Sequence, residues 1–302
     1  MRVLIADDEP LSSLILEHAL VEWGYEVISA RDGDEAWSVL QGSEPPRMAV
    51  LDWMMPGRDG LNIIRGLRDP PRDPYTYLLL LTARSHHEDL IQAMEAGADD
   101  FLAKPFDPEE LRVRLRAGRR IVELQEQLVA AREELRAQAT HDSLTGVWNR
   151  GSILEAMARE LERGEREKRP FSIAMADVDY FKSVNDRLGH QVGDVVLSEV
   201  ARRMSARVRP YDMVGRYGGE EFLVVLPGCD SREAQRMVER LRAEVGMGIL
   251  VNDQPAVYVT LSFGVSTFKP GSGLTCEKLL RSADGALYAA KDLGRNRAVT
   301  GT

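Results

Sequence analysis

Short apolar runs alternate with amphipathic stretches from the start of the chain to about residue 105. The expected strands cover residues 2–6, 25–30, 48–53, 77–83 and 100–105, and the expected helices cover 10–23, 33–42, 60–68 and 86–96. This order predicts an α/β domain over residues 1–120, with a doubly wound, five-stranded parallel sheet covered by helices on both faces. Functional side chains are then expected at the carboxyl ends of the strands.

A continuous helical pattern follows, from Asp107 to about Thr140. Positions at alternating spacings of three and four stand out against a background rich in Glu and Arg; they are Ile121, Leu124, Leu128, Ala131, Leu135 and Gln138. This spacing predicts a helical coiled-coil linker over residues 121–140. A single solvated helix that only connects two domains is the alternative.

The remaining residues, 141–302, show a different order of elements. Helices are expected at 150–165, 191–208, 231–245 and 276–292, and strands at 171–179 and 257–268, with a hairpin across Gly218–Gly219 and a short last strand. Because strands joined by a hairpin are antiparallel neighbours, this order predicts an α+β domain with a largely antiparallel sheet.

Length and composition narrow the class of protein. The 302 residues suggest two domains, and the net charge of −9 argues against nucleic acid or an anionic membrane as a partner. Cys229 and Cys276 form no CxxC pair, which favours free thiols in a reducing cytoplasm. The sequence has no signal-peptide layout and no apolar run of the roughly 20 residues that span a bilayer, so we expect a cytoplasmic protein.

Three carboxylates fall at strand ends in the first domain. Asp7 and Asp8 follow the first strand and Asp52 lies in the third, while Thr82 and Lys104 close the fourth and fifth. Acids that cluster at one sheet edge repel one another, and a hard divalent cation relieves that repulsion. Asp52 is then a candidate nucleophile toward a phosphoryl donor, with Lys104 balancing charge and Thr82 bonding a phosphoryl oxygen.

The stretches ADDEP, LDWMMPGRDG, LLTAR and FLAKPF resemble a two-component receiver domain over residues 1 to about 120. The resemblance implies phosphorylation of Asp52 by a cognate histidine kinase. It also implies Mg²⁺ held by Asp8, Asp52 and the Met54 carbonyl, beside Asp7. Finally, it implies a switch in which Thr82 moves toward the phosphate and Phe101 turns inward, and a cis Lys104–Pro105 bond.

The second domain carries its own acidic residues. Asp177 ends an apolar strand, and Glu220 and Glu221 stand just past the two glycines of the hairpin. If those strands are neighbours, the three carboxylates converge. A site with no His or Cys favours Mg²⁺ or Mn²⁺ over zinc, and two such metals suit attack on a phosphate.

Basic and polar residues near these acids suggest a nucleotide. Lys182, Lys291 and Arg295 supply charge for a triphosphate, and the last two are expected on one face of the last helix. Asp194, with Asn185, offers an acceptor for the N1–H and amine of guanine, which adenine lacks. A helix cap at Asp194 and a turn at Asn185 are the alternatives.

Five separated stretches resemble the GGDEF family of diguanylate cyclases over about residues 140–302: DSLTGVWNR (142–150), DVDYFKSVNDRLGHQVGD (177–194), RYGGEEF (216–222), SFGVS (262–266) and ALYAAKDLGRNR (286–297). The resemblance implies condensation of two GTP into cyclic di-GMP with loss of two pyrophosphates. It assigns metal binding to Asp177, Glu220, Glu221 and the Val178 carbonyl. Glu220 is either a ligand alone or also the base for the attacking 3′-hydroxyl.

The implied product is a two-fold symmetric ring, so two active sites must face each other, each with one GTP. We therefore expect a homodimer, or a tetramer built from such dimers. Phosphorylation of Asp52 is expected to change the register or crossing of the linker helices, so that the cyclase domains meet.

A candidate site for product inhibition precedes Gly218 and Gly219. Arg209 and Asp212 fit the inhibitory RxxD motif of the family, and Arg240 is a weaker candidate for the same product site. A helix-end salt bridge is the alternative for the first pair. The competing functions are a degenerate cyclase that only senses cyclic di-GMP, and a palm-like polymerase or single-nucleotide purine cyclase; the acidic net charge argues against the polymerase.

Overall fold

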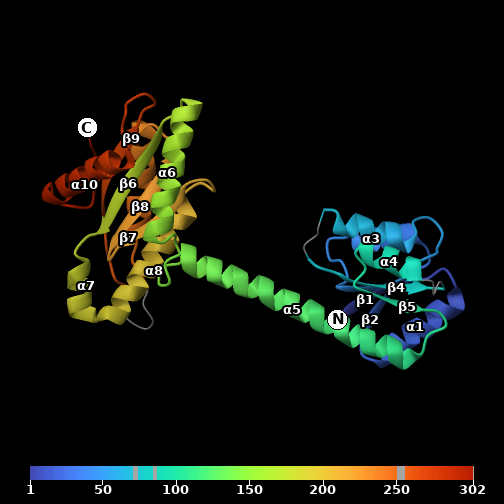
Figure 1. Cartoon of the computed structure of the whole chain (residues 1–302). Helices are drawn as coiled ribbons and strands as arrows, with labels where there is room; N and C mark the ends of the chain where they lie inside the picture. Colours follow the sequence, from blue (N-terminus) through green and yellow to red (C-terminus); the bar gives the residue numbers. More distant parts are fainter. Residues whose placement is uncertain (71–73, 84–86, 250–255, 302) are drawn as a thin grey trace. The chain divides into compact units, whose positions relative to one another are not determined.

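The computed structural model describes residues 1–70, 74–83, 87–249 and 256–301 (Figure 1). Residue 86, the predicted start of the fourth helix, lies outside these ranges. The chain divides into two compact units, Met1–Glu133 and Glu134–Thr302, and each is described by itself. The division falls within the predicted linker, 121–140. None of the helices in the described ranges is long and apolar enough to cross a membrane.

The first unit contains the predicted parallel sheet. Its strands are β1 (Arg2–Ala6), β2 (Glu26–Ala30), β3 (Met48–Asp52), β4 (Tyr77–Thr82) and β5 (Asp100–Ala103), in the order β2-β1-β3-β4-β5. Every pairing is parallel. The order reverses between β1 and β3, which creates the crevice at the carboxyl edge where doubly wound folds place their chemistry.

Helices cover both faces of this sheet. The face formed by Leu4, Leu51 and Leu80 packs on α2 (Gly33–Leu40), α3 (Gly60–Arg68) and α4 (His87–Glu95). Alternate residues of the same strands, such as Val50 and Leu79, pack on α1 (Pro10–Glu22) and the start of α5 (Pro108–Thr140). Because strand residues alternate between faces, both faces are apolar and polar groups are left to the strand ends.

Helix α5 is continuous from Pro108 to Thr140 and runs from the first unit into the second. Its start agrees with the helical pattern predicted from Asp107, and Leu111, Leu115 and Val122 are buried in the core of the first unit. Beyond Val122 the apolar side chains are exposed; Leu128 and Leu135 are 64% and 65% exposed. The coiled coil itself stays a prediction.

The second unit contains a five-stranded sheet, β10-β9-β6-β8-β7. Its strands are β6 (Phe171–Val178), β7 (Met213–Gly218), β8 (Glu221–Pro227), β9 (Leu261–Phe268) and β10 (Ala298–Thr300). The β6–β8, β6–β9 and β7–β8 pairings are antiparallel and β9–β10 is parallel, so the largely antiparallel prediction is confirmed. The prediction that β9 begins at residue 257 is wrong: Leu261 pairs with the last residue of β6, Val178, whereas Val257 bridges to Ile249.

Five helices in the described part of this unit pack on the two faces of the sheet: α6 (Arg150–Glu167), α7 (Phe181–Leu188), α8 (His190–Arg207), α9 (Ser231–Val245) and α10 (Cys276–Asp292). Helix α7 was not predicted. Phe181, Val184 and Leu188 stand at helical spacing, but the run is only eight residues long and only Phe181 on it is buried. Gly189, with φ 86°, separates it from α8.

Candidate functional site

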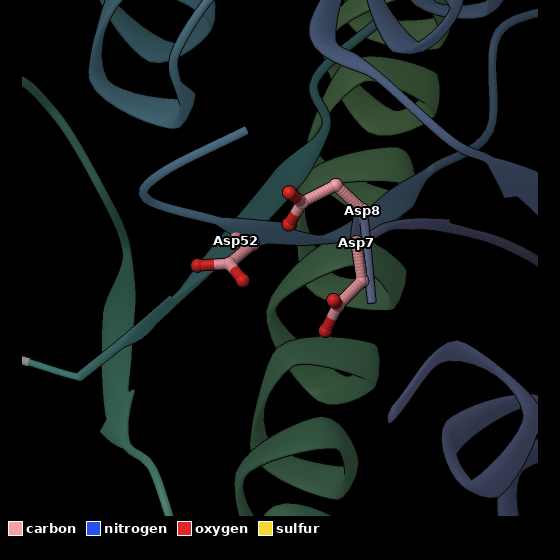
Figure 2. Close-up of side chains that lie close together, drawn as sticks. All are labelled: Asp7, Asp8 and Asp52. Atoms are coloured by element: carbon pink, nitrogen blue, oxygen red, sulfur yellow. The ribbon is translucent and has the colours of Figure 1, made fainter. Parts of the chain in front are cut away.

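Three aspartates meet at the carboxyl edge of the first sheet. Asp7 and Asp8 follow β1, and Asp52 ends the neighbouring strand β3 (Figure 2). Ligand oxygens of the three carboxylates lie within 4.8 Å of one another. Asp7 and Asp52 are buried and Asp8 is exposed, so the cluster opens to solvent on one side. Such an oxygen-only cluster fits a hard divalent cation.

Lys104 joins two of these aspartates. Its Nζ lies 2.7 Å from Asp7 Oδ2 and 2.6 Å from Asp52 Oδ2. Burial raises the pKa of Asp52, and the nearby Asp7 adds to the rise, while the hydrogen bond and charge of Lys104 oppose it. Three carboxylates thus share one ammonium group at this edge.

The predicted switch residues lie beside this cluster. Thr82 ends β4 and is fully buried, and Phe101 on β5 is partly buried against the core. The backbone N–H of Lys104 donates to the Thr82 carbonyl at 2.7 Å, and the Lys104–Pro105 bond is cis, as the resemblance implied. The Met54 N–H donates to Asp52 Oδ1 at 3.3 Å.

The acids of the second unit come together through strand pairing. Asp177 on β6 is the register partner of Glu221, the first residue of β8. Glu220 lies in the turn between β7 and β8, and its carbonyl accepts a hydrogen bond from the Val178 N–H at 3.3 Å. The strands that carry Asp177 and Glu221 are neighbours, which is the condition under which convergence was predicted.

Excess negative charge marks this second site. Asp177 is 6% exposed, and its Oδ2 lies 2.7 Å from Lys291 Nζ. Burial raises the pKa of Asp177, and burial together with the charge of Asp177 raises the pKa of Glu220 and of Glu221. The donor set fits Mg²⁺ or Mn²⁺. The ligand atoms of this second site are spaced more widely than those of the cluster in the first unit. Among the described residues, Asp7, Asp8 and Asp52 are the one group of potential metal ligands whose ligand atoms all lie within 4.8 Å of one another.

The prediction that Lys291 and Arg295 lie on one face of the last helix is wrong. Helix α10 ends at Asp292, and Gly294, Arg295 and Asn296 have φ values of 107°, 62° and 46°. The Arg295 N–H donates to the Ala290 carbonyl and the Gly294 N–H to that of Lys291, which is a Schellman ending. Arg295 therefore leaves the helix, and its guanidinium carbon lies 4.6 Å from the centre of the Tyr180 ring.

The predicted base-reading residues come from two packed helices. Asn185 on α7 is half-buried, and its Oδ1 has no hydrogen-bond partner among the described residues. A Cβ at Gly193 on α8 would lie 1.9 Å from that oxygen. Asp194 follows Gly193 and is exposed, and Lys182 is exposed on the first turn of α7.

The two residues of the RxxD motif do not form a side-chain ion pair. The Asp212 carboxylate is buried and accepts a hydrogen bond from the backbone N–H of Arg209 at 2.9 Å. The exposed Arg209 guanidinium instead lies over the Tyr211 ring, at 5.8 Å. Arg240 is exposed on α9 and donates to the Arg207 carbonyl. The helix-end salt bridge proposed as an alternative is therefore wrong.

Sequence reasoning missed two residue relationships. Arg216 on β7 donates through Nη1 to Asp142 Oδ1 at 3.1 Å and through Nε to the Gly219 carbonyl at 2.9 Å. Asp179, two residues beyond Asp177, is buried and fully occupied by hydrogen bonds. Arg216 and Asp179 both lie in stretches on which the family resemblance rests. Their roles become visible only through their hydrogen-bond partners, most of which lie far away in the sequence.

Two family models match the chain. The response regulator receiver domain matches residues 3–116, and the diguanylate cyclase GGDEF domain matches residues 139–297. The response regulator PleD of Caulobacter vibrioides is 31% identical over 300 residues, which cover 99% of this chain. The chain spans 65% of the length of PleD.

Solved structures are similar as well. Diguanylate cyclase SiaD of Pseudomonas aeruginosa, solved with its activator SiaC, is 37% identical with a TM-score of 0.53, and the match covers 64% of this chain and 74% of SiaD. The coiled coil and GGDEF domain of DgcB from Caulobacter crescentus, solved with c-di-GMP, is 31% identical with a TM-score of 0.56, covering 63% and 99%. The chain therefore belongs to the GGDEF family of diguanylate cyclase domains and carries a response regulator receiver domain ahead of it.

Proposed function

We propose that this protein is a phosphorylation-regulated diguanylate cyclase that condenses two GTP into cyclic di-GMP and two pyrophosphates. The observation that carries the proposal is the pairing of Asp177 with Glu221 on neighbouring strands, with Glu220 in the glycine turn and Lys291 on Asp177. An acidic, oxygen-only site with basic residues beside it suits transfer of a nucleotidyl group.

Each candidate residue has a task in this reaction. Asp177, Glu220, Glu221 and the Val178 carbonyl would hold Mg²⁺ or Mn²⁺, which when bound supplies positive charge for the triphosphate and acidifies a hydroxyl group. The basic side chains of Lys182, Lys291 and Arg295 bind phosphates. Asn185 and Asp194 read guanine, because a carboxylate accepts hydrogen bonds from its N1–H and amine.

Bond formation requires a base and two substrates. Glu220 accepts the proton of the 3′-hydroxyl, and that oxygen attacks the α-phosphorus of the opposite GTP. The bond between the α-phosphorus and the bridging oxygen breaks, and pyrophosphate leaves. Two such steps close the ring, so two active sites must face each other in a dimer. The exposed apolar residues of α5, such as Leu128 and Leu135, support its pairing with a second copy.

The receiver supplies the control. A histidine kinase transfers a phosphoryl group to Asp52. Asp7, Asp8, Asp52 and the Met54 carbonyl would hold a divalent cation, which when bound supplies positive charge beside that group. Lys104 contacts the charged group, Thr82 bonds it and Phe101 turns inward. The change alters the pairing of α5 in the dimer. GTP and a kinase of this type are cytoplasmic, so the same proposal places the protein in the cytoplasm.

Product feedback completes the proposal. Cyclic di-GMP binds at Arg209, Asp212 and Arg240, and holds the cyclase domains apart. Support comes from the exposed Arg209 guanidinium, which is free of an ion pair with Asp212 and can bond a guanine edge or a phosphate with two N–H groups.

Incubation of the protein with GTP and Mg²⁺, followed by mass spectrometry, tests the function. We expect a product with the mass of two GTP less two pyrophosphates. Glu221→Gln should lower the rate by about 100-fold, whereas Glu155→Gln, at an exposed position on α6, should not change it. A single-nucleotide cyclic product or a polymer would refute the proposal, and cyclic di-GMP binding without turnover would identify a sensor.

A further inference from the structure

Asp179 is a buried carboxylate that the proposed chemistry leaves without a task. It lies just beyond the end of β6 and is 3% exposed. Its Oδ1 accepts a hydrogen bond from Ser262 Oγ at 2.7 Å, and its Oδ2 accepts from Thr260 Oγ1 at 2.6 Å. Its own N–H donates to the Thr260 carbonyl at 2.9 Å. These bonds attach the end of β6 to the start of β9.

The remaining bond of Asp179 reaches the segment after α10. The Asn296 N–H donates to Asp179 Oδ2 at 3.1 Å. Arg295 and Asn296 both have left-handed backbone angles, with φ values of 62° and 46°. Residues with a Cβ adopt this conformation at a cost, so the surrounding structure must hold it. The buried Asp179 carboxylate is the anchor that the structure provides on one side of this turn.

Tyr180 contacts the side chain of Arg295 in the same turn. It also has a left-handed φ, 57°, and the residue is 66% exposed. The Arg295 guanidinium lies 4.6 Å from the ring centre, and Arg295 Nη1 is 3.5 Å from Tyr180 Oη. A guanidinium stacked on an aromatic face keeps its outer N–H groups directed to solvent, where an anion can accept them.

We propose that Asp179 and Tyr180 are positioning residues that act through Arg295. Asp179 fixes the turn and Tyr180 fixes the guanidinium, so that Arg295 meets the triphosphate of the substrate beside Asp177. The inference rests on the proposed function, because it takes Arg295 as a phosphate-binding residue. Neither Asp179 nor Tyr180 touches the reacting atoms in this proposal.

The experiment is a double-mutant cycle on nucleotide binding in the full-length protein. The probes are a non-reactive GTP analogue with a methylene bridge between the α- and β-phosphates, with Mg²⁺, and guanosine without phosphates. The variants are Asp179→Asn, Tyr180→Leu and Arg295→Ala, alone and in the two pairs that include Arg295→Ala. Asp186→Asn, an exposed aspartate of α7, is the matched control.

We expect Asp179→Asn and Arg295→Ala each to weaken binding of the analogue by roughly 10-fold, with guanosine binding unchanged. Tyr180→Leu should weaken it by a smaller factor. In the Arg295→Ala background, neither further substitution should change binding by more than about 2-fold, because the group through which they act is gone. A role confined to holding the fold would instead lower the unfolding temperature and affect both probes.

Three outcomes would overturn the inference. They are binding of the analogue by Asp179→Asn equal to that of Asp186→Asn, full additivity with Arg295→Ala, and an equal loss for guanosine. If Asp179→Asn does not fold, the cycle of Tyr180→Leu with Arg295→Ala decides in the same way. A wild-type protein that binds no GTP analogue would refute the proposed function, whereas the other outcomes leave that function standing.

Discussion

Arg216 connects Asp142, in the loop that follows α5, to the carbonyl of Gly219 in the turn that carries Glu220. The guanidinium makes both bonds at once, through Nη1 and Nε. Hydrogen bonds from Thr145 and Arg216 lower the pKa of Asp142, although burial alone would raise it. The Arg216 side chain thus links the segment that follows the long helix to the acidic turn.

Replacing Arg216 by Lys should therefore lower kcat for cyclic di-GMP formation by about 10-fold, because a lysine cannot make both bonds and Glu220 loses its position. KM for GTP should change little. Steady-state kinetics measures both quantities. The control is Arg202→Lys, which changes an exposed arginine bonded to Glu199 on α8. A kcat equal to that of the wild type would show that the connection does not position the turn.

Replacing Gly193 by Ala should weaken selection for guanine. The new Cβ would lie 1.9 Å from Asn185 Oδ1, so Asn185 must move. We expect KM for GTP to rise by about 10-fold and the preference for GTP over inosine triphosphate to fall, because inosine lacks the amine. Gly285→Ala on α10 is the control, since a Cβ there meets no atom within 4 Å. An unchanged preference for GTP over inosine triphosphate would show that Asn185 does not recognise the base.

Replacing Asp52 by Asn should abolish activation of the cyclase and leave its basal rate. Beryllofluoride mimics a phosphoryl group on an aspartate, and an amide cannot bind it in that way. The measurements are cyclase rate and oligomeric state, with and without beryllofluoride and Mg²⁺. An equal response of the Asp52→Asn variant and the wild type would exclude Asp52 as the phosphoacceptor, and no response in either protein would exclude the switch.

Replacing Arg209 by Ala should relieve product inhibition by about 10-fold or more in the concentration of cyclic di-GMP required, because hydrogen bonds to charged groups are each worth about 1.5–3 kcal/mol. The initial rate without product should stay the same. Inhibition curves with added cyclic di-GMP measure the effect, and Arg236→Ala, an exposed arginine on α9, is the control. Identical inhibition curves for the wild type and Arg209→Ala would show that product inhibition does not act through Arg209.

Glu199 should make stability depend on pH in acid. Hydrogen bonds from Arg202 and Arg203 lower its pKa to about 2, against an ordinary value of 4.5. A carboxylate with a lowered folded-state pKa stabilises the fold above its ordinary pKa, and this contribution is lost as pH falls toward about 2. The unfolding temperature of Glu199→Gln should therefore lie below that of the wild type at pH 7.

The two unfolding temperatures should approach each other as the pH falls below about 4.5. Protonation of Glu199 should also affect helix packing, because it removes a charged partner of Arg203. Arg203 donates to the carbonyls of Val245 and Gly248 at the end of α9, and so links that helix to α8. Glu155→Gln, on the exposed side of α6, should show no such dependence. A difference between Glu199→Gln and the wild type that stays constant with pH would refute the assignment.

Local sequence pattern determined most of the architecture. Alternating apolar runs and amphipathic stretches predicted the parallel sheet of the first unit, since its central strands β3 and β4 are buried on both faces and read as apolar runs. The acids Asp7, Asp8 and Asp52 were predicted together because parallel strands end at one edge. The turn with Glu220 and Glu221 was predicted because two adjacent glycines interrupt an apolar pattern.

Only the tertiary structure decided which distant groups meet. Helix α7 was missed because it is only eight residues long; the structure shows that its apolar side, Phe181 and Val184, packs into the core beside Val192 and Val196 of α8. Arg295 was predicted on a helix face, but its N–H closes the end of α10 and its side chain stacks on Tyr180. The bonds of Asp179 and Arg216 join segments far apart in the chain, and no spacing within one segment can encode a partner in another.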